Sequence, residues 1–166
     1  FKRETFSSYP DDVTVTHLTK KGNKTLDFTL WNSLTEDLLA NGDYSWEYSN
    51  YKNGHVTTDE HGILLKGTVK DNGLKFASYL GIKTDGTVTV QNETLTVTGA
   101  SYATLYLSAK TNFAQNPKTN YRKDIDLEKT VKGIVEAAKA KDYETLKKDH
   151  IKDYQSLFNR VKLNLG

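Results

Sequence analysis

Short segments in which apolar and polar residues alternate occupy the first two thirds of this 166-residue chain. A period of two places successive side chains on opposite faces of a β-strand, so each segment has one face to bury. The segments are rich in β-branched and aromatic residues, and turn sequences such as Asp85-Gly86 separate them. Predicted strands cover residues 12–19, 25–31, 62–69, 74–83, 87–91, 94–98 and 102–109. Short strands and turns at this spacing predict mostly antiparallel sheets that pack as a sandwich.

Two amphipathic helices are predicted after a polar loop. Residues 127–140 place apolar side chains on one face, and Asp126 precedes them as a candidate N-cap. Asp142 precedes the second helix, which runs from residue 143 to about 159. Its apolar face comprises Tyr143, Leu146, His150, Tyr154, Leu157 and Phe158. Packing of the two helices as an antiparallel pair, or on a neighbouring domain, would bury both faces.

The expected fold class is mainly β: an antiparallel β-sandwich followed by two C-terminal α-helices. We place the sandwich portion in residues 1–112 and the loop with its helical linker in residues 113–166. Near the end the pattern returns to period two at Val161, Leu163 and Leu165, which predicts a final strand. Because the chain contains no Met and begins with Phe, we expect it to be a segment of a longer protein.

The composition excludes several kinds of site. There is no Cys, so disulfides and thiolate chemistry are absent. The 23 basic and 21 acidic residues are scattered, unlike the basic stripe of a nucleic-acid-binding protein. No apolar run approaches the roughly 18 residues of a membrane-spanning helix. The motifs GxSxG, GxGxxG and GxxxxGK[ST] are also missing. We therefore predict no nucleic-acid partner and no membrane span.

The histidines do not predict a metal site, because no spacing among them brings three ligands together. They are His17, His55, His61 and His150. For His17 and His150 we expect partly buried, hydrogen-bonded rings, and we expect His150 to hold its helix against the neighbouring structure.

Adjacent acidic residues occur at positions 11–12, 36–37 and 59–60, and we interpret them as surface groups rather than catalytic carboxylates. Asp11 and Asp12 follow Pro10 at the start of a predicted strand, where we expect them to accept hydrogen bonds from nearby backbone N–H groups. The sequence therefore predicts no catalytic residue, no metal ligand and no cofactor.

An aromatic-rich stretch offers the one candidate binding surface. Trp31, Tyr44, Trp46 and Tyr48 could form a platform on which a sugar ring stacks. Alternatively, the last three of these residues share one face of a strand and fill a core or an interface between domains. The sequence leaves both interpretations open.

Two long motifs resemble one family. Residues 3–13, RETFSSYPDDV, resemble the REYFASYPDDV signature in the N-terminal domain of glycoside hydrolase family 95. Residues 150–161, HIKDYQSLFNRV, resemble the HxxDYxxLFxRV sequence of that family's linker. Between them, Thr111-Asn112-Phe113 matches the T-x-F that follows a late strand of the family's domain. The resemblance extends over essentially the whole chain, although residues 31–61 are longer and richer in aromatics than we expect for the family.

The resemblance implies a division of labour. Family 95 contains α-L-fucosidases and some α-L-galactosidases, in which an (α/α)6 barrel after the linker hydrolyses the glycan with inversion and without a cofactor. This chain then corresponds to part of a larger β super-sandwich plus the linker. Its expected partner is the downstream catalytic barrel of the same polypeptide, and its expected location is extracellular or on the cell surface.

Two other functions remain open at this point. One is an autonomous glycan-binding β-sandwich module that uses the aromatics near residues 31–51. The other is a sandwich that binds a protein partner. In either case the sheet edge and the apolar helix face that truncation exposes could also form a dimer of the isolated segment.

Overall fold

Nine strands lie within residues 1–33, 52–69 and 71–163, the parts of the chain that the computed structural model describes. They are β1 (Lys2–Ser8), β2 (Val13–Thr19), β3 (Leu26–Leu30), β4 (Lys52–Asp59), β5 (Gly62–Val69), β6 (Lys75–Thr84), β7 (Thr87–Gln91), β8 (Thr94–Ala100) and β9 (Tyr102–Thr111). A large sheet has the order β1-β2-β9-β6-β5-β4, and a small sheet has the order β3-β8-β7. Every pairing is antiparallel.

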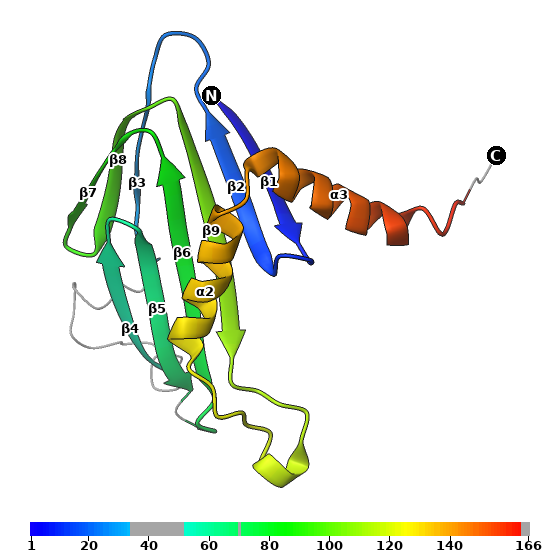
Figure 1. Cartoon of the computed structure of the whole chain (residues 1–166). Coiled ribbons are helices and arrows are strands. Elements are labelled where there is room, and N and C mark those ends of the chain that lie inside the picture. The colour runs from blue at the N-terminus through cyan, green and yellow to red at the C-terminus, as the bar shows by residue number, and fades with distance from the viewer. Residues whose placement is uncertain (34–51, 70, 164–166) are drawn as a thin grey trace.

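The large sheet lies between the small sheet and helix α2 (Leu127–Lys139), as Figure 1 shows. On one face, Leu95 and Val97 of the small sheet share an apolar core with Ile63 and Ile82 of the large sheet. On the other face, a second core joins α2 to β2, β6 and β9. Alternate side chains of the large sheet therefore enter an apolar core on each of its two faces. The predicted fold class, a mainly β antiparallel sandwich with two C-terminal helices, is confirmed.

All seven predicted strands are present, some of them longer by one or two residues, and two further strands were missed. Strand β1, with the sequence KRETFSS, buries only Ser8 completely, and β4 buries only Val56 among its described side chains. Both strands stand at an end of the large sheet as described, where each pairs with one neighbour. A strand that is open on one side tolerates polar residues on both faces, so it carries little apolar alternation.

Both helices begin where their N-caps predict. The carboxylate of Asp126 accepts a hydrogen bond from the Lys129 N–H, and that of Asp142 accepts one from the Thr145 N–H. Helix α3 (Tyr143–Phe158) then lies beside β1 and extends away from the sheet (Figure 1). None of the helices in the described ranges has the length and hydropathy of a membrane-spanning segment.

The arrangement of the helices differs from both predicted alternatives, since α2 is covered by the sheet of its own domain. Its side chains Val131, Val135 and Ala138 are buried against the strands. The predicted final strand is wrong for residues 161–163, which have no regular structure, and Leu165 lies outside the described residues.

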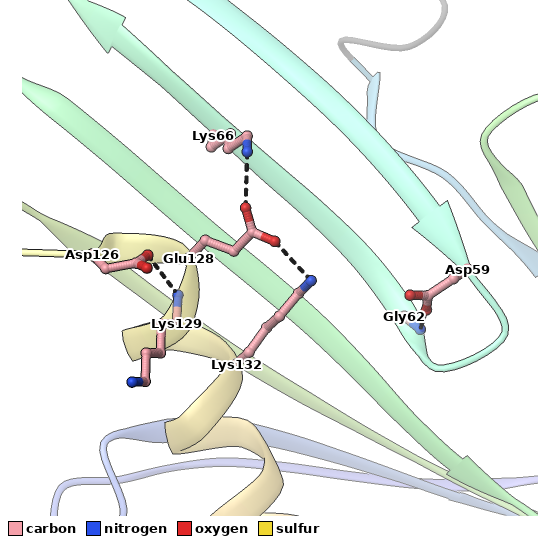
Figure 2. Close-up of polar contacts among 7 residues, drawn as sticks. All are labelled: Asp59, Gly62, Lys66, Asp126, Glu128, Lys129 and Lys132. Carbon is pink, nitrogen blue, oxygen red and sulfur yellow. Dashed lines mark hydrogen bonds and ion pairs between the residues drawn. The ribbon is translucent and has the colours of Figure 1, made fainter.

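Polar contacts hold the start of α2 against β5 (Figure 2). The Glu128 carboxylate accepts hydrogen bonds from Lys66 Nζ at 2.8 Å and from Lys132 Nζ at 2.9 Å. These two ammonium groups lower the pKa of Glu128 to about 2, so the carboxylate stays charged at neutral pH. At the hairpin that joins β4 to β5, Asp59 accepts a hydrogen bond from the Gly62 N–H at 3.0 Å. These contacts fix the helix register more than they stabilise the fold, because the ion pairs are largely exposed.

Two glycines give a matched test of the helix–sheet contact. A Cβ at Gly81 would lie 2.5 Å from Val135 Cγ1, so Gly81→Ala must push α2 away from β6. We expect a loss of about 1–3 kcal/mol in the free energy of unfolding. On the exposed side of α2, a Cβ at Gly133 meets nothing within 4 Å. Gly133→Ala should gain about 0.5–1 kcal/mol from helix propensity. Urea unfolding measures both, and a neutral Gly81→Ala would contradict the described packing.

Candidate functional site

Six rings form an aromatic ladder that leads from the large sheet along α3. Consecutive centroid distances are 4.1 Å for His17–Tyr143, 6.0 Å for Tyr143–Phe6, 5.0 Å for Phe6–His150, 6.1 Å for His150–Tyr154 and 5.1 Å for Tyr154–Phe158. Phe6 comes from β1 and His17 from β2, and the other four rings come from α3. Side chains at spacings of three and four residues stand above one another on a helix, which aligns the α3 rings along one face.

The first half of α3 is firmly attached to the sheet. Leu146 is fully buried, and the Glu4 carboxylate of β1 accepts a hydrogen bond from Lys147 Nζ at 2.7 Å. Hydrogen bonds from Lys147 and Lys2 lower the pKa of Glu4 to about 2. Just before the helix, Lys141 Nζ donates to Asp11 at 2.5 Å. Strand β1 and its following turn therefore hold the start of α3 through apolar and charged contacts together.

His17 is a partly buried member of the ladder. Its Nδ1 lies 2.7 Å from Thr104 Oγ1, and its ring stacks on Tyr143. Burial removes water from the ring and lowers the pKa of His17 below 6.5. The predicted hydrogen-bonded, partly buried imidazole is confirmed for His17. His150 is likewise partly buried, and its stack on Phe6 holds α3 to β1 as expected. The expected hydrogen bond to the His150 ring is not found within the described residues.

The second half of α3 exposes its apolar side chains. We name the α3 tail face for Ile151, Tyr154, Leu157 and Phe158, whose exposed fractions are 41%, 52%, 58% and 64%. This half of the helix points away from the sheet in Figure 1, and no described element covers it. An amphipathic helix gains its stability from the surface that covers its apolar face, so this face has the character of an interaction surface.

The predicted sugar platform is only partly within the described residues. Trp31 follows β3 and is about half exposed, while Tyr44, Trp46 and Tyr48 lie outside the described residues. The platform therefore stays a prediction, and so does the interpretation of Glu36 and Asp37.

Within the described residues, Asp11, Asp12 and Asp59 of the adjacent acidic pairs make hydrogen bonds or ion pairs with neighbouring groups of the fold. Asp11 accepts hydrogen bonds from Ser8 Oγ at 2.6 Å and from Lys141, and Asp12 pairs with Lys110. The expectation that these two carboxylates bind backbone N–H groups is wrong, because side chains of neighbouring elements reach them first. Asp59 does bind backbone, accepting from the N–H groups of His61 and Gly62.

Five carboxyl groups within the described ranges have a shifted pKa, and in each of them the pKa is lowered. They are Glu4, Asp27, Asp85, Glu128 and Asp142. A glycosidase general acid must instead keep its proton near neutral pH, which requires a raised pKa. None of these five groups can take that role. In the same part of the chain no group of three His, Cys, Asp or Glu residues converges as a metal site.

A β-sandwich with a sheet-bound helix and a projecting second helix defines the fold class of this domain. Residues 1–116 match the family described as "Glycosyl hydrolase family 65, N-terminal domain", and the chain belongs to this family. It is also similar to Alpha-L-fucosidase 2 of Arabidopsis thaliana, with 24% identity over 190 residues. The match covers all of this chain but 21% of the relative, so the chain spans about a fifth of that protein's length.

These comparisons confirm the central part of the sequence-based assignment. The chain is an N-terminal domain of the kind found in glycoside hydrolases, as its two long motifs predicted. Assignment to family 95 in particular stays a prediction. The sequence identified the ladder residues of α3, but it missed Phe6 and His17 as their partners. Those residues lie more than 100 positions away, and only the β1–β2 pairing and the turn of the chain after α2 bring them together.

Two substitutions in the ladder should distinguish the stabilisation by an apolar ring from the cost of a buried hydroxyl group. Phe6→Ala removes a partly buried ring from the middle of the ladder and should cost about 2 kcal/mol in unfolding free energy. The Tyr143 hydroxyl is buried and makes no hydrogen bond of good geometry among the described residues, although burial and the nearby Glu4 carboxylate raise its pKa. Tyr143→Phe should therefore be neutral or slightly stabilising. Urea unfolding of both variants checks this, and a large loss in Tyr143→Phe would show that its hydroxyl is satisfied.

The ladder should also be sensitive to acid. Because the folded-state pKa of His17 lies below 6.5, the unfolded chain binds the proton more readily. The neutral ring therefore contributes fully to the free energy of unfolding above pH 6.5. This contribution is lost as the pH falls from 6.5 through the lowered pKa of the folded state. The charged groups that act on the ring are Glu4 and Lys2 of β1 and Glu144 and Lys147 of α3. The melting temperature is then measured at several pH values between 5 and 8. It should depend less on pH in His17→Gln than in the native chain, and His61→Gln, which changes an exposed histidine, is the control.

Proposed function

We propose that this chain is a non-catalytic N-terminal domain segment of a glycoside hydrolase similar to family 95. The parent enzyme would hydrolyse terminal α-L-fucosyl or α-L-galactosyl residues of glycans with inversion, outside the cell or at its surface. The segment would support the catalytic barrel that follows it in the same polypeptide. The family of N-terminal domains to which the chain belongs and its similarity to an α-L-fucosidase support this proposal.

The observation that carries the proposal is the α3 tail face. The aromatic ladder fixes the first half of α3 to β1 and β2, and the same row of rings continues onto the exposed half. A surface that is rigidly aimed and apolar suits a permanent contact better than a transient one. We assign this face to the catalytic barrel of the same chain, because the similar fucosidase extends over about five times the length of the matched segment.

The similarity to an α-L-fucosidase supports the proposed substrate class. The five carboxyl groups with a lowered pKa do not suit the role of proton donor. Acid and base would both come from the barrel, and this domain would contribute rigidity to one side of it. No cofactor enters that chemistry.

A paired hydrolysis assay tests the proposal. The chain as it stands and a form that continues past residue 166 would be offered 2′-fucosyllactose and an aryl α-L-galactoside. We expect turnover in the longer form only, and the preferred substrate then names the sugar. Turnover by the 166-residue chain, or by neither form, would contradict the proposal. Saturable glycan binding without turnover in either form would favour an autonomous glycan-binding module.

Polar substitutions on the α3 tail face test the role of the helix. Leu157→Ser with Phe158→Ser removes two exposed apolar side chains, so the 166-residue chain should unfold at an unchanged temperature. In the longer form the same pair should lower the temperature of inactivation, because the domain and the barrel lose contact area. Ser156→Ala, on the same turn of the helix, is the control. If the 166-residue chain instead forms dimers and the double substitution converts them to monomers, the α3 tail face is an interface between copies.

A further inference from the structure

A second aromatic surface lies on the loop between β9 and α2. After Thr111 the chain passes beyond the end of the large sheet, forms the 3-10 turn η2 (Pro117–Thr119) and returns to α2 (Figure 1). Phe113 and Arg122 face each other there in an isolated antiparallel bridge. The rings of Phe113 and Tyr121 lie parallel within 2°, with centroids 6.3 Å apart. We name these two rings the Phe113–Tyr121 platform.

Both rings of the platform are open to solvent. Phe113 is 51% exposed and Tyr121 is 44% exposed, although aromatic side chains ordinarily gain most by burial. They take no part in either apolar core of the domain. The platform is also separate from the aromatic ladder, which lies at the β1 edge. Packing of this domain therefore does not explain why two rings stand here.

The loop that carries the rings is fixed by backbone hydrogen bonds. Ala114 N–H donates to the Tyr121 carbonyl at 3.0 Å, and Tyr121 N–H donates to the Asn116 carbonyl at 3.0 Å. At its base, Asn112 is buried and its Oδ1 accepts from the Lys75 N–H of β6 at 2.9 Å. Arg122 Nη2 donates to the Asn72 carbonyl at 2.7 Å. A loop tied to the sheet in this way presents its rings in one orientation, which lowers the entropy cost of binding.

The backbone at the second ring is strained. Tyr121 has φ 56°, and Asn120 before it has φ 50°. Asn tolerates the left-handed region, but a bulky side chain such as Tyr does so at a cost in energy. Glycine would occupy position 121 without that cost, yet it would leave no ring to lie beside Phe113. Strain that persists where a simpler residue would relieve it is typical of positions with a role in binding.

The chemistry of the surroundings indicates the class of ligand. The rings offer flat apolar faces, while the turn between them carries Asn116, Lys118, Thr119 and Asn120, all exposed and polar. A pyranose ring has the complementary pattern, because its C–H groups form an apolar face and its hydroxyls surround that face. The Arg122 guanidinium donates to two backbone carbonyls, but Lys118 and Lys123 on the same loop are exposed cations. A single-stranded nucleic acid is therefore the competing ligand, and the test below includes it.

We propose that the Phe113–Tyr121 platform is a saccharide-contact site, on which a sugar ring of the glycan stacks away from the catalytic centre. The platform itself rests on ring geometry and exposure, and the choice of a saccharide rests also on the proposed function. It differs from the sequence-predicted surface around Trp31 in its residues and in its place on the fold. The site would hold part of a glycan by stacking and hydrogen bonds, and it performs no bond-breaking step.

Calorimetric titration of the 166-residue chain with 2′-fucosyllactose and with lactose tests the site. We expect saturable binding of at least one of them, with Phe113→Leu and Tyr121→Ala each weakening it by at least about tenfold. Phe158→Ala and Trp31→Ala are matched controls, since each removes an exposed ring elsewhere and should leave the affinity unchanged. Tyr121→Gly separates binding from folding, because it should raise or maintain the melting temperature while it abolishes binding.

The opposing outcomes are distinct. No binding of either sugar by the native chain, or binding that is lost only in Trp31→Ala, overturns the platform as the saccharide site. Binding of a single-stranded oligonucleotide with no response to either sugar overturns it in favour of a nucleic-acid site. None of these results bears on hydrolysis by the longer form, so the platform can fail while the proposed function stands. Equally, sugar binding that depends on both rings would remain valid if the longer form hydrolysed neither substrate.

Discussion

Burial of the α2 face on the large sheet is the contact on which the domain depends. Val131 and Val135 have no exposed surface, and Gly81 of β6 lacks the side chain that would otherwise stand between helix and sheet. This contact closes the second face of a sheet whose first face is covered, among the described residues, by the strands of the small sheet. It also fixes where the chain turns after α2, and hence where α3 meets β1. The aromatic ladder is therefore a consequence of helix–sheet packing.

Local sequence signals predicted most elements because each depends on nearby residues. Alternation marked the central strands, and Asp126 and Asp142 marked the helix starts through hydrogen bonds that span three residues. Strands β1 and β4 gave little signal since they end the described sheet and bury few side chains. The packing of α2 could not be predicted, because periodicity identifies an apolar face and not the surface that covers it.

The functional surfaces were harder to predict than the fold. The exposed half of α3 was visible as an apolar stripe, but its support by Phe6 and His17 required the register of β1 with β2. The Phe113–Tyr121 platform depends on a positive φ at a tyrosine, which no residue preference indicates. The T-x-F motif pointed to Phe113, whereas the second ring became apparent only from the backbone of the turn.

The contacts between β1 and α3, which include the Phe6–His150 stack and the Glu4–Lys147 ion pair, have a consequence for mechanical load. A pull on the C-terminal end of the chain passes along α3 to its contacts with the domain, which are Phe6 and Glu4 of β1 and the core around the buried Leu146. Strand β1 is bonded to β2 alone among the described strands, so it can peel away while the sheet from β2 to β4 and the covering α2 remain folded. The β1 edge is therefore where we expect the domain to open first under tension.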